Sequence, residues 1–403
     1  MPIPRRVAGL ALAAGLLGAC TSGGGDAAPE APAGPSRAEQ ADAAAAVQSA
    51  ASILRANLTS VLQQHVFLTG AVTATVVAGA DPAPAAAELD ANSVNLSRVV
   101  GAVAGGEAAD RFLDLWRGHV GLLTGFAAAS AAGDEAGVAA AKAGLDAYRD
   151  EMAGFLNAIN PHLAKDTMAD SQKAYLGAVQ QAIAAQAEGD PAAAGKLKQA
   201  AENMPRMATL LVAGITKNAP GAFEGRFDGS AATLRSVLAS KLQEHVYLSW
   251  MAAGTAAGGA DKEAVATLDD NAVELANIVG SAYGDEAAGQ FLGLWRSQVS
   301  AVVDYARARA GGDGTGAQAA AARVAAEPPR FAAFLGAANP RLDEAVLAAD
   351  LGAHARALLA AIDSQAAGSP SRFADVRAAA GRTRDMAARL STAIAAQFPD
   401  RFS

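Results

Sequence analysis

The chain of 403 residues contains one cysteine, few aromatic side chains (5%) and no excess of positive charge. A single cysteine excludes an internal disulfide framework and a structural zinc site built on several thiolates. The chain carries 32 Lys and Arg against 40 Asp and Glu, a formal net charge of −8. A nucleic-acid-binding protein normally presents a basic patch or stripe, so we expect no nucleic acid among the partners.

Catalytic motifs are also missing. The sequence has no glycine-rich phosphate loop after a strand, no Gly-x-Ser-x-Gly and no His-Glu-x-x-His. The acidic residues Asp150 and Glu151 are matched in the internal repeat described below by Pro329 and Arg330, which argues against a paired-carboxylate site. We therefore predict that the protein is not an enzyme.

Alanine is abundant and accounts for much of the 52% hydrophobic fraction. Alanine is the best helix former and is depleted in strands, and no segment shows a convincing alternation of apolar and polar residues. These observations predict an all-α protein.

The N-terminus has the pattern of a secretory signal peptide, which we assign to residues 1–19. Arg5 and Arg6 precede the apolar run 7–17, which is too short to span a bilayer permanently. The run ends in Leu17-Gly18-Ala19-Cys20, which resembles the lipobox of bacterial lipoproteins. The resemblance implies that Cys20 is acylated, for example with palmitate, and becomes the first residue of the mature chain.

The residues after Cys20 fit an anchored protein. Residues 21–37 are rich in Gly, Ala, Pro and Ser and lack apolar periodicity, so we assign residues 20–43 to a flexible tether. The expected location is the extracytoplasmic face of the cell membrane, with the membrane as a partner through the N-terminal lipid.

The remainder of the chain is an internal repeat. Gln64-His65-Val66-Phe67-Leu68 recurs as Glu244-His245-Val246-Tyr247-Leu248, and the offset of 180 becomes 179 after Asp261. This register predicts a tandem duplication, with one domain over 44–224 and a second over 225–403. Short connections favour antiparallel neighbours, so we expect two up-and-down helical bundles of about six helices each.

The expected helices of the first copy run over 44–79, 84–104, 107–131, 135–158, 164–187 and 191–217. Asn160-Pro161 and Asn339-Pro340 should break the chain in the middle of each copy. Pro205 should kink the sixth helix or delay its start. Its counterpart is Arg384, so the second copy is expected to lack this feature.

Polar and sulfur-containing residues recur on the apolar stripes of these helices. Trp116 and Trp295 are expected between the inward stripe and the surface. The candidate ligand or metal residues are His65, Asn92, His119, Tyr175 and Met207 in the first copy and His245, Asn271, Gln298, His354 and Met386 in the second.

Two interpretations of these residues remain open. The first is a buried, hydrogen-bonded plug, because interior polar groups must find partners on neighbouring helices. The second is a metal or ligand site in each bundle core, since imidazole suits copper, iron, nickel or zinc and thioether sulfur suits copper(I). The inward Glu and Glu-x-x-His residues that define di-iron bundles are missing. The cofactor is therefore unknown, with a transition metal as the candidate.

The repeated blocks Leu-x-Gln/Glu-His-Val-Phe/Tyr-Leu, Leu-Asp-x-Asn and Leu-Trp-Arg, together with Gln397-Phe398-Pro399-Asp400-Arg401-Phe402, carry a family resemblance. From about residue 50 to its end, the chain resembles a poorly characterised family of secreted or lipid-anchored helical proteins of Gram-positive-type bacteria. The resemblance implies a three-histidine pattern, which maps onto His65, His119 and Tyr175 and onto His245, Gln298 and His354. Each copy departs from the pattern at one position.

These observations predict a lipid-anchored protein of the cell envelope that acts as a non-catalytic binding or scaffold module. Recognition would use the bundle surfaces or the cleft between them, and the partner would be an envelope protein or a small ligand. The alternative is binding of a metal or small ligand through the inward His, Asn and Met residues.

Overall fold

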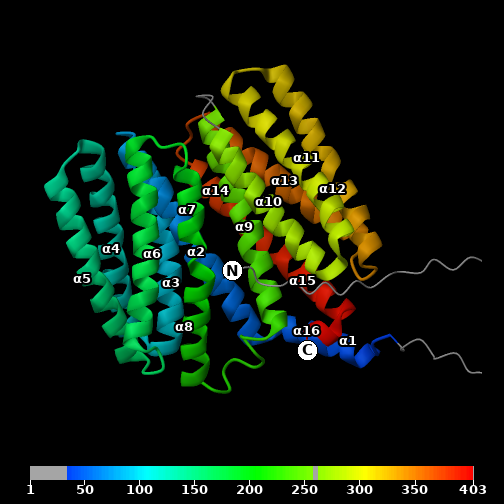
Figure 1. Ribbon diagram of the computed structural model, residues 1–403, viewed down its shortest axis with the longest axis horizontal. Coiled ribbons are helices and arrows are strands. Elements are labelled where there is room, and N and C mark those ends of the chain that lie inside the picture. Colours follow the sequence, from blue (N-terminus) through cyan, green and yellow to red (C-terminus); the bar gives the residue numbers. More distant parts are fainter. Residues whose placement is uncertain (1–33, 257–261, 403) are drawn as a thin grey trace, which may run out of the picture. The chain divides into compact units, whose positions relative to one another are not determined.

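The computed structural model describes residues 34–256 and 262–402, and all regular secondary structure in them is helical (Figure 1). The all-α class expected from the sequence is confirmed. Residues 35–403 form one compact unit. The expected signal peptide, Cys20 and tether residues up to 33 lie outside the described residues.

The helices of the first repeat follow an N-terminal helix and are joined by short connections. They are α1 (Arg37–Gln48), α2 (Ala50–Val77), α3 (Ala83–Ala104), α4 (Gly106–Ala132), α5 (Glu135–Ile159), α6 (Lys165–Glu188), α7 (Ala193–Ala201) and α8 (Met204–Asn218).

Each helix from α2 to α8 has a counterpart that begins 180 or 179 residues later. The counterparts are α9 (Ser230–Ala256), α10 (Lys262–Tyr283), α11 (Asp285–Ala310), α12 (Gly314–Ala338), α13 (Glu344–Ala366), α14 (Arg372–Gly381) and α15 (Thr383–Gln397), and α16 (Pro399–Phe402) ends the chain. Below, "first repeat" means α2–α8 and "second repeat" means α9–α15.

Local sequence explains several helix ends. Asn160 and Asn339 adopt extended backbone after α5 and α12, as expected for residues that precede proline. Gly133 and Gly189 close α4 and α6 with φ of +66°, a left-handed conformation that a side chain would strain. The side chain of Asp134 then accepts a hydrogen bond from a backbone amide in the first turn of α5.

Two expected helices are divided in the structure. The helix expected over 44–79 is interrupted at Ser49, whose extended backbone (ψ 151°) ends α1 and whose hydroxyl caps α2. The one expected over 191–217 is interrupted between α7 and α8. The second repeat has the same interruption at Arg382, between α14 and α15, so the expectation that only Pro205 would disturb this helix was wrong.

The helix α1 packs away from the repeat that follows it in the sequence. Ala43 and Val47 of α1 are buried against Ala231 and Ala395 of the second repeat. Residues 37–43, which we expected in the tether, form the first turns of this helix. The first helix therefore precedes the first repeat in the sequence but packs on the second repeat.

The helix α2 and its counterpart α9 run side by side through the middle of the molecule (Figure 1). The hydroxyls of Thr59 and Ser236 lie 2.9 Å apart, and further along the rings of Phe67 and Tyr247 stack with centroids 4.9 Å apart. Because the contacts advance in the same direction along both chains, α2 and α9 are parallel. Residues at an offset of 180 therefore face each other across an approximate two-fold axis.

One described helix, α13, is long and apolar enough to cross a membrane by length and composition. Leu347, Leu358 and Ile362 of this helix are buried in the core. The helix packs against α12, α14 and α9.

Candidate functional site

The side chains of His65, His119 and Tyr175 meet inside the first repeat. They come from α2, α4 and α6, and each is at most 1% exposed. The Nε2 atom of His65 lies 3.1 Å from Nε2 of His119 and 3.1 Å from the hydroxyl of Tyr175. The structure thus brings together the three positions that the family resemblance singled out, and we call them the imidazole cluster.

Aromatic rings enclose the imidazole cluster. The ring of Trp116 lies 4.7 Å from that of His65 and 4.6 Å from that of His119, centroid to centroid. The ring of Tyr148 stacks on the other imidazole, His119, at 4.7 Å. Trp116 is only 4% exposed, so the expectation that it would lie between the inward stripe and the surface was wrong.

Both imidazoles of the cluster are neutral at pH 7. Burial lowers the pKa of His119 to about 3, and burial together with the neighbouring His119 lowers the pKa of His65 well below its ordinary value. Burial likewise raises the pKa of the Tyr175 hydroxyl, which keeps its proton. Within the described residues the Nδ1 atoms of both histidines have no hydrogen-bond partner.

The second repeat has a reduced version of this cluster. The rings of His245 and His354 lie 6.1 Å apart, and burial lowers their pKa values to about 3 and about 4. Gln298 takes the place of His119 and is 5% exposed. Both nitrogens of His245 lack a hydrogen-bond partner among the described residues. The two repeats therefore offer different donor sets.

The other predicted site residues lie elsewhere. The amide of Asn92 donates to the carbonyl of Val61 and to the Gln64 side chain. Asn271 likewise donates to the carbonyl of Lys241 and to the Glu244 side chain. The thioethers of Met207 and Met386 line small apolar cavities of about 70 and 40 Å³ beside Trp116 and Trp295.

A partly buried charge network, which was not predicted from the sequence, lies beside Asn271. The carboxylates of Glu202, Glu244 and Glu274 converge within 4.8 Å of one another. Lys198 and Lys241 lie among them: Lys198 Nζ is 2.8 Å from Glu274, and Lys241 Nζ is 3.1 Å from Glu244. The ammonium groups supply the positive charge that such an acidic group needs, so we do not treat it as a metal site.

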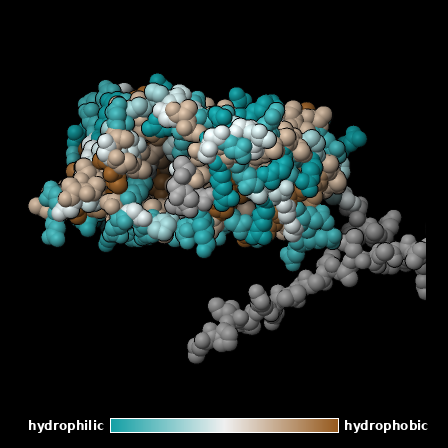
Figure 2. Space-filling model, turned by 90° about the horizontal axis from the view of Figure 1, so that it is seen from above, coloured by the Kyte–Doolittle hydropathy of each residue, from teal (hydrophilic) through white to brown (hydrophobic). Residues whose placement is uncertain are grey.

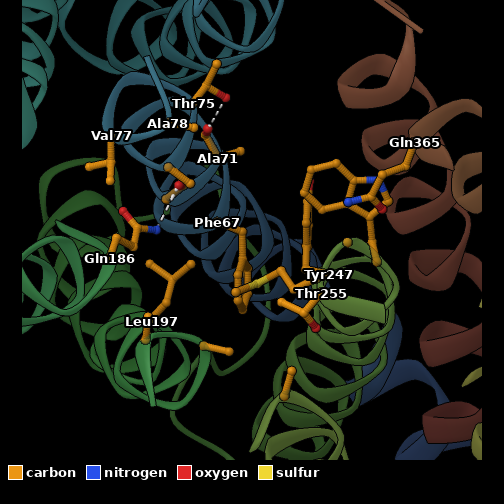
Figure 3. Close-up of a pocket in the computed structure, with 18 of the residues that line it drawn as sticks. Phe67, Ala71, Thr75, Val77, Ala78, Gln186, Leu197, Tyr247, Thr255 and Gln365 are labelled. Carbon is orange, nitrogen blue, oxygen red and sulfur yellow. Dashed lines mark hydrogen bonds between the residues drawn. The ribbon is translucent and has the colours of Figure 1, made fainter. Parts of the chain in front are cut away.

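An apolar cleft of about 620 Å³ opens where the C-terminal parts of α2 and α9 approach α7 and α14. Ala71 and Thr75 of α2 and Thr255 of α9 line it, together with the stacked rings of Phe67 and Tyr247 (Figure 3). Figure 2 looks onto this end of the molecule and shows a hollow with hydrophobic residues on its walls. We call this hollow the α2–α9 cleft.

Polar groups at fixed positions interrupt the apolar lining of the α2–α9 cleft. The Gln186 amide donates to the carbonyl of Gly70 at 3.0 Å and is held there (Figure 3). In the part of the chain that the structure describes, Trp250 Nε1 and Gln365 Oε1 are buried without a hydrogen-bond partner. Both atoms are covered by neighbouring protein atoms, so the surface that the cleft presents is mainly apolar.

One difference between the two repeats in the sequence marks the position of the cleft. Gly70 and Trp250 occupy matching positions in α2 and α9, so the repeat breaks its pattern where the cleft lies. A Cβ on Gly70 would lie 2.3 Å from Leu197, whereas the large ring of Trp250 extends the opposite wall. Comparing the repeats for differences in side-chain size would have pointed to this region.

Comparisons with protein-family models, with curated proteins and with solved structures find no match to this chain.

Proposed function

We propose that the protein is a non-catalytic binding protein of the cell envelope, anchored by a lipid on Cys20, that holds a small apolar molecule in the α2–α9 cleft. The two repeats would act as two bundles that form one binding unit. The pattern Leu17-Gly18-Ala19-Cys20 supports the anchor. The cleft is the observation that carries the binding function.

The size and lining of the cleft support this function. Ligand pockets typically enclose 300–1,000 Å³, with mostly apolar walls and a few polar groups that orient the ligand. The cleft, at about 620 Å³, meets this description through Phe67, Leu197, Trp250 and Phe373 on its walls. Removing an apolar ligand from water would supply about 25 cal/mol for each Å² of surface buried.

The charged residues at the cleft are already engaged, which favours an uncharged ligand. Asp190 pairs with Lys196 at 2.7 Å. The guanidinium of Arg372 donates to the carbonyls of Gly368 and Ser369 and lies over the ring of Phe373. A neutral, mainly apolar molecule would therefore match this lining.

The test uses the uncharged dye N-phenyl-naphthylamine, whose fluorescence rises in an apolar site. We expect one dye to bind per chain, and Ala74→Trp, which fills the cleft from an exposed position on its wall, to weaken binding at least about tenfold. Ala139→Trp, at an exposed position of α5 outside the cleft, is the matched control and should bind as the original chain does. Equal binding by both variants, or none by the original chain, would contradict the proposal.

The imidazole cluster supports a second candidate function, the binding of one transition metal ion. Two nitrogen ligands at 2.0–2.1 Å from a metal lie about 3 Å apart, and the Nε2 atoms of His65 and His119 are separated by 3.1 Å. Both imidazoles are neutral, as metal ligands must be. Copper, iron or zinc would suit the two imidazoles, and the Tyr175 oxygen would become a third ligand only by releasing the proton that burial holds on it.

Metal titration separates this candidate from a hydrogen-bonded plug. We expect one equivalent of copper(II) or zinc to bind and to raise the melting temperature. The variant His119→Gln, which copies Gln298 of the second repeat, should lose that rise. If the purified chain takes up no stoichiometric metal by elemental analysis, the cluster is a structural plug.

A further inference from the structure

The approximate two-fold axis creates two equivalent positions, one on each side of the α2–α9 pair. On one side Asn92 of α3 donates to residue 64, and on the other Asn271 of α10 donates to residue 244, at 2.9 and 3.0 Å. The same framework therefore holds both positions. The side chains around them differ.

The second-repeat side is filled with charge. Lys198 and Lys241 interlock there with Glu202, Glu244 and Glu274, and Glu244 is fully buried. Each lysine contacts more than one carboxylate, so their charges are satisfied within the protein.

On the first-repeat side the matching residues lack most of these charges. Val61, Gln64, Asn95 and Gly381 stand where the other side has Lys241, Glu244, Glu274 and Glu202. The cation is retained, because Arg377 matches Lys198. An open cavity of about 600 Å³ lies here, and we call it the Arg377 pocket.

The Arg377 pocket has an unbalanced positive charge. Arg377 donates to the Glu88 carboxylate at 2.8 Å and to the side-chain oxygen Oε1 of Gln64 at 3.2 Å, so one arginine and one glutamate neutralise each other. Arg384 also lines the pocket and is exposed, and within the described residues it forms no hydrogen bond or ion pair. The net charge of the lining is therefore +1, in a chain whose net charge is −8.

We propose that the Arg377 pocket binds a small hydroxylated anion, of the class of sugar phosphates and sugar acids. A guanidinium matches the geometry of phosphate and carboxylate oxygens. Asn57 and Asn95 line the same pocket, and their amides can both donate to and accept from hydroxyl groups, whereas the amide of Gln243 already donates to Ser60 and Gln63. This site lies apart from the apolar cleft and is independent of the function proposed for it.

The chain supplies a variant that tests the proposal. Gly381→Glu copies Glu202 of the filled side and places a carboxylate beside Arg384. A Cβ at Gly381 meets only the Arg384 guanidinium, at 3.7 Å, so the substitution fits. The uncharged Gly381→Gln occupies similar space and separates the effect of charge from that of volume. Arg384→Gln removes the unpaired cation from an exposed position.

Calorimetric titrations of the full chain with glucose 6-phosphate, glucuronate and glucose provide the readout. We expect one site for the phosphate or the carboxylate and none for glucose, with binding weakened at least about tenfold by Arg384→Gln and Gly381→Glu and less by Gly381→Gln. Higher salt should also weaken binding. No binding of either anion at about 10 mM, or equal binding by the original chain, Arg384→Gln and Gly381→Glu, would overturn the proposal.

Discussion

The Nε2 atoms of His65 and His119 lie 3.1 Å apart, and both side chains are fully buried. At this separation both rings cannot carry a proton on the facing nitrogens, and neither can become charged without a large desolvation cost. Their neutrality makes the stability of the fold dependent on pH.

The first prediction concerns acid stability. Since the pKa of folded His119 is about 3 and its ordinary value is 6.5, the unfolded chain takes up a proton between these pH values and the folded chain does not. The contribution of His119 is therefore present above pH 6.5 and is lost as the pH falls toward 3. By pH 4.5 this proton uptake by the unfolded chain lowers the free energy of unfolding by about 2–3 kcal/mol.

Urea unfolding of the original chain and of His119→Gln from pH 7.5 to pH 4.5 checks this expectation. The original chain should lose about 2–3 kcal/mol more of its unfolding free energy over that range than the variant does. The carboxylates also lose stabilising charge in acid, and both proteins share that loss. Parallel pH profiles would show that His119 is protonated in the folded state.

The second prediction concerns Glu244, which is fully buried and accepts hydrogen bonds from Asn271 and Gln63. Glu244→Leu should cost about 3 kcal/mol, because it leaves buried amide donors and Lys241 with fewer acceptors. Glu244→Gln keeps a carbonyl acceptor, as Gln64 does in the first repeat, and should cost about 1 kcal/mol.

An exposed ion pair provides the comparison for Glu244. Asp90 pairs with Arg117 at 2.7 Å, with about half of each side chain exposed. Asp90→Ala should therefore change the unfolding free energy by less than about 1 kcal/mol. Thermal or chemical unfolding of the three variants measures these changes. An equal loss of unfolding free energy in Asp90→Ala and Glu244→Leu would contradict this account.

The third prediction concerns Gly70, which faces the buried side chain of Leu197. A Cβ at this position would lie 2.3 Å from Leu197 Cδ2, so Gly70→Ala forces α7 or the leucine rotamer to move. We expect a loss of about 1–3 kcal/mol despite the better helix propensity of alanine. Gly125→Ala, in α4 with open space around it, should be neutral or stabilising in the same unfolding assay.

The fourth prediction concerns the anchor. Cys20→Ser removes the thiol that the lipobox-like pattern marks for acylation, so the variant should leave the membrane fraction and appear in the soluble fraction. Mass spectrometry of the original chain should show an added lipid mass on Cys20. An original chain that fractionates as soluble and carries no lipid would rule out the anchor.

The sequence was sufficient to predict the helical class and most helix boundaries, because alanine content, Asn-Pro pairs and glycine caps act locally. It was not sufficient for the interruption at Ser49, which has no proline or glycine beside it, or for the one at Arg382, because the single Gly381 that ends α14 does not by itself predict a helix end. At these breaks the direction in which the chain continues depends on tertiary packing of the flanking helices. An example is α1, which packs against the second repeat.

The candidate site was predicted to a similar degree. Helical spacing placed His65, His119 and Tyr175 on inward stripes, and the structure brings them into contact. Spacing alone could not show that Asn92 and Asn271 turn toward the helix pair at the centre instead. The partner of a buried polar group depends on which helices pack together, and the sequence of a single helix does not determine that packing.

The parallel pairing of α2 and α9 in a single chain has a consequence for how such a molecule can change. In a dimer of identical subunits every substitution appears twice, so a residue that suits one side of the axis must be tolerated on the other. Covalent linkage of the two halves removes that constraint. One side can accumulate interlocked lysines and glutamates that hold the halves together, while its former equivalent loses them and becomes free to meet solvent and solutes.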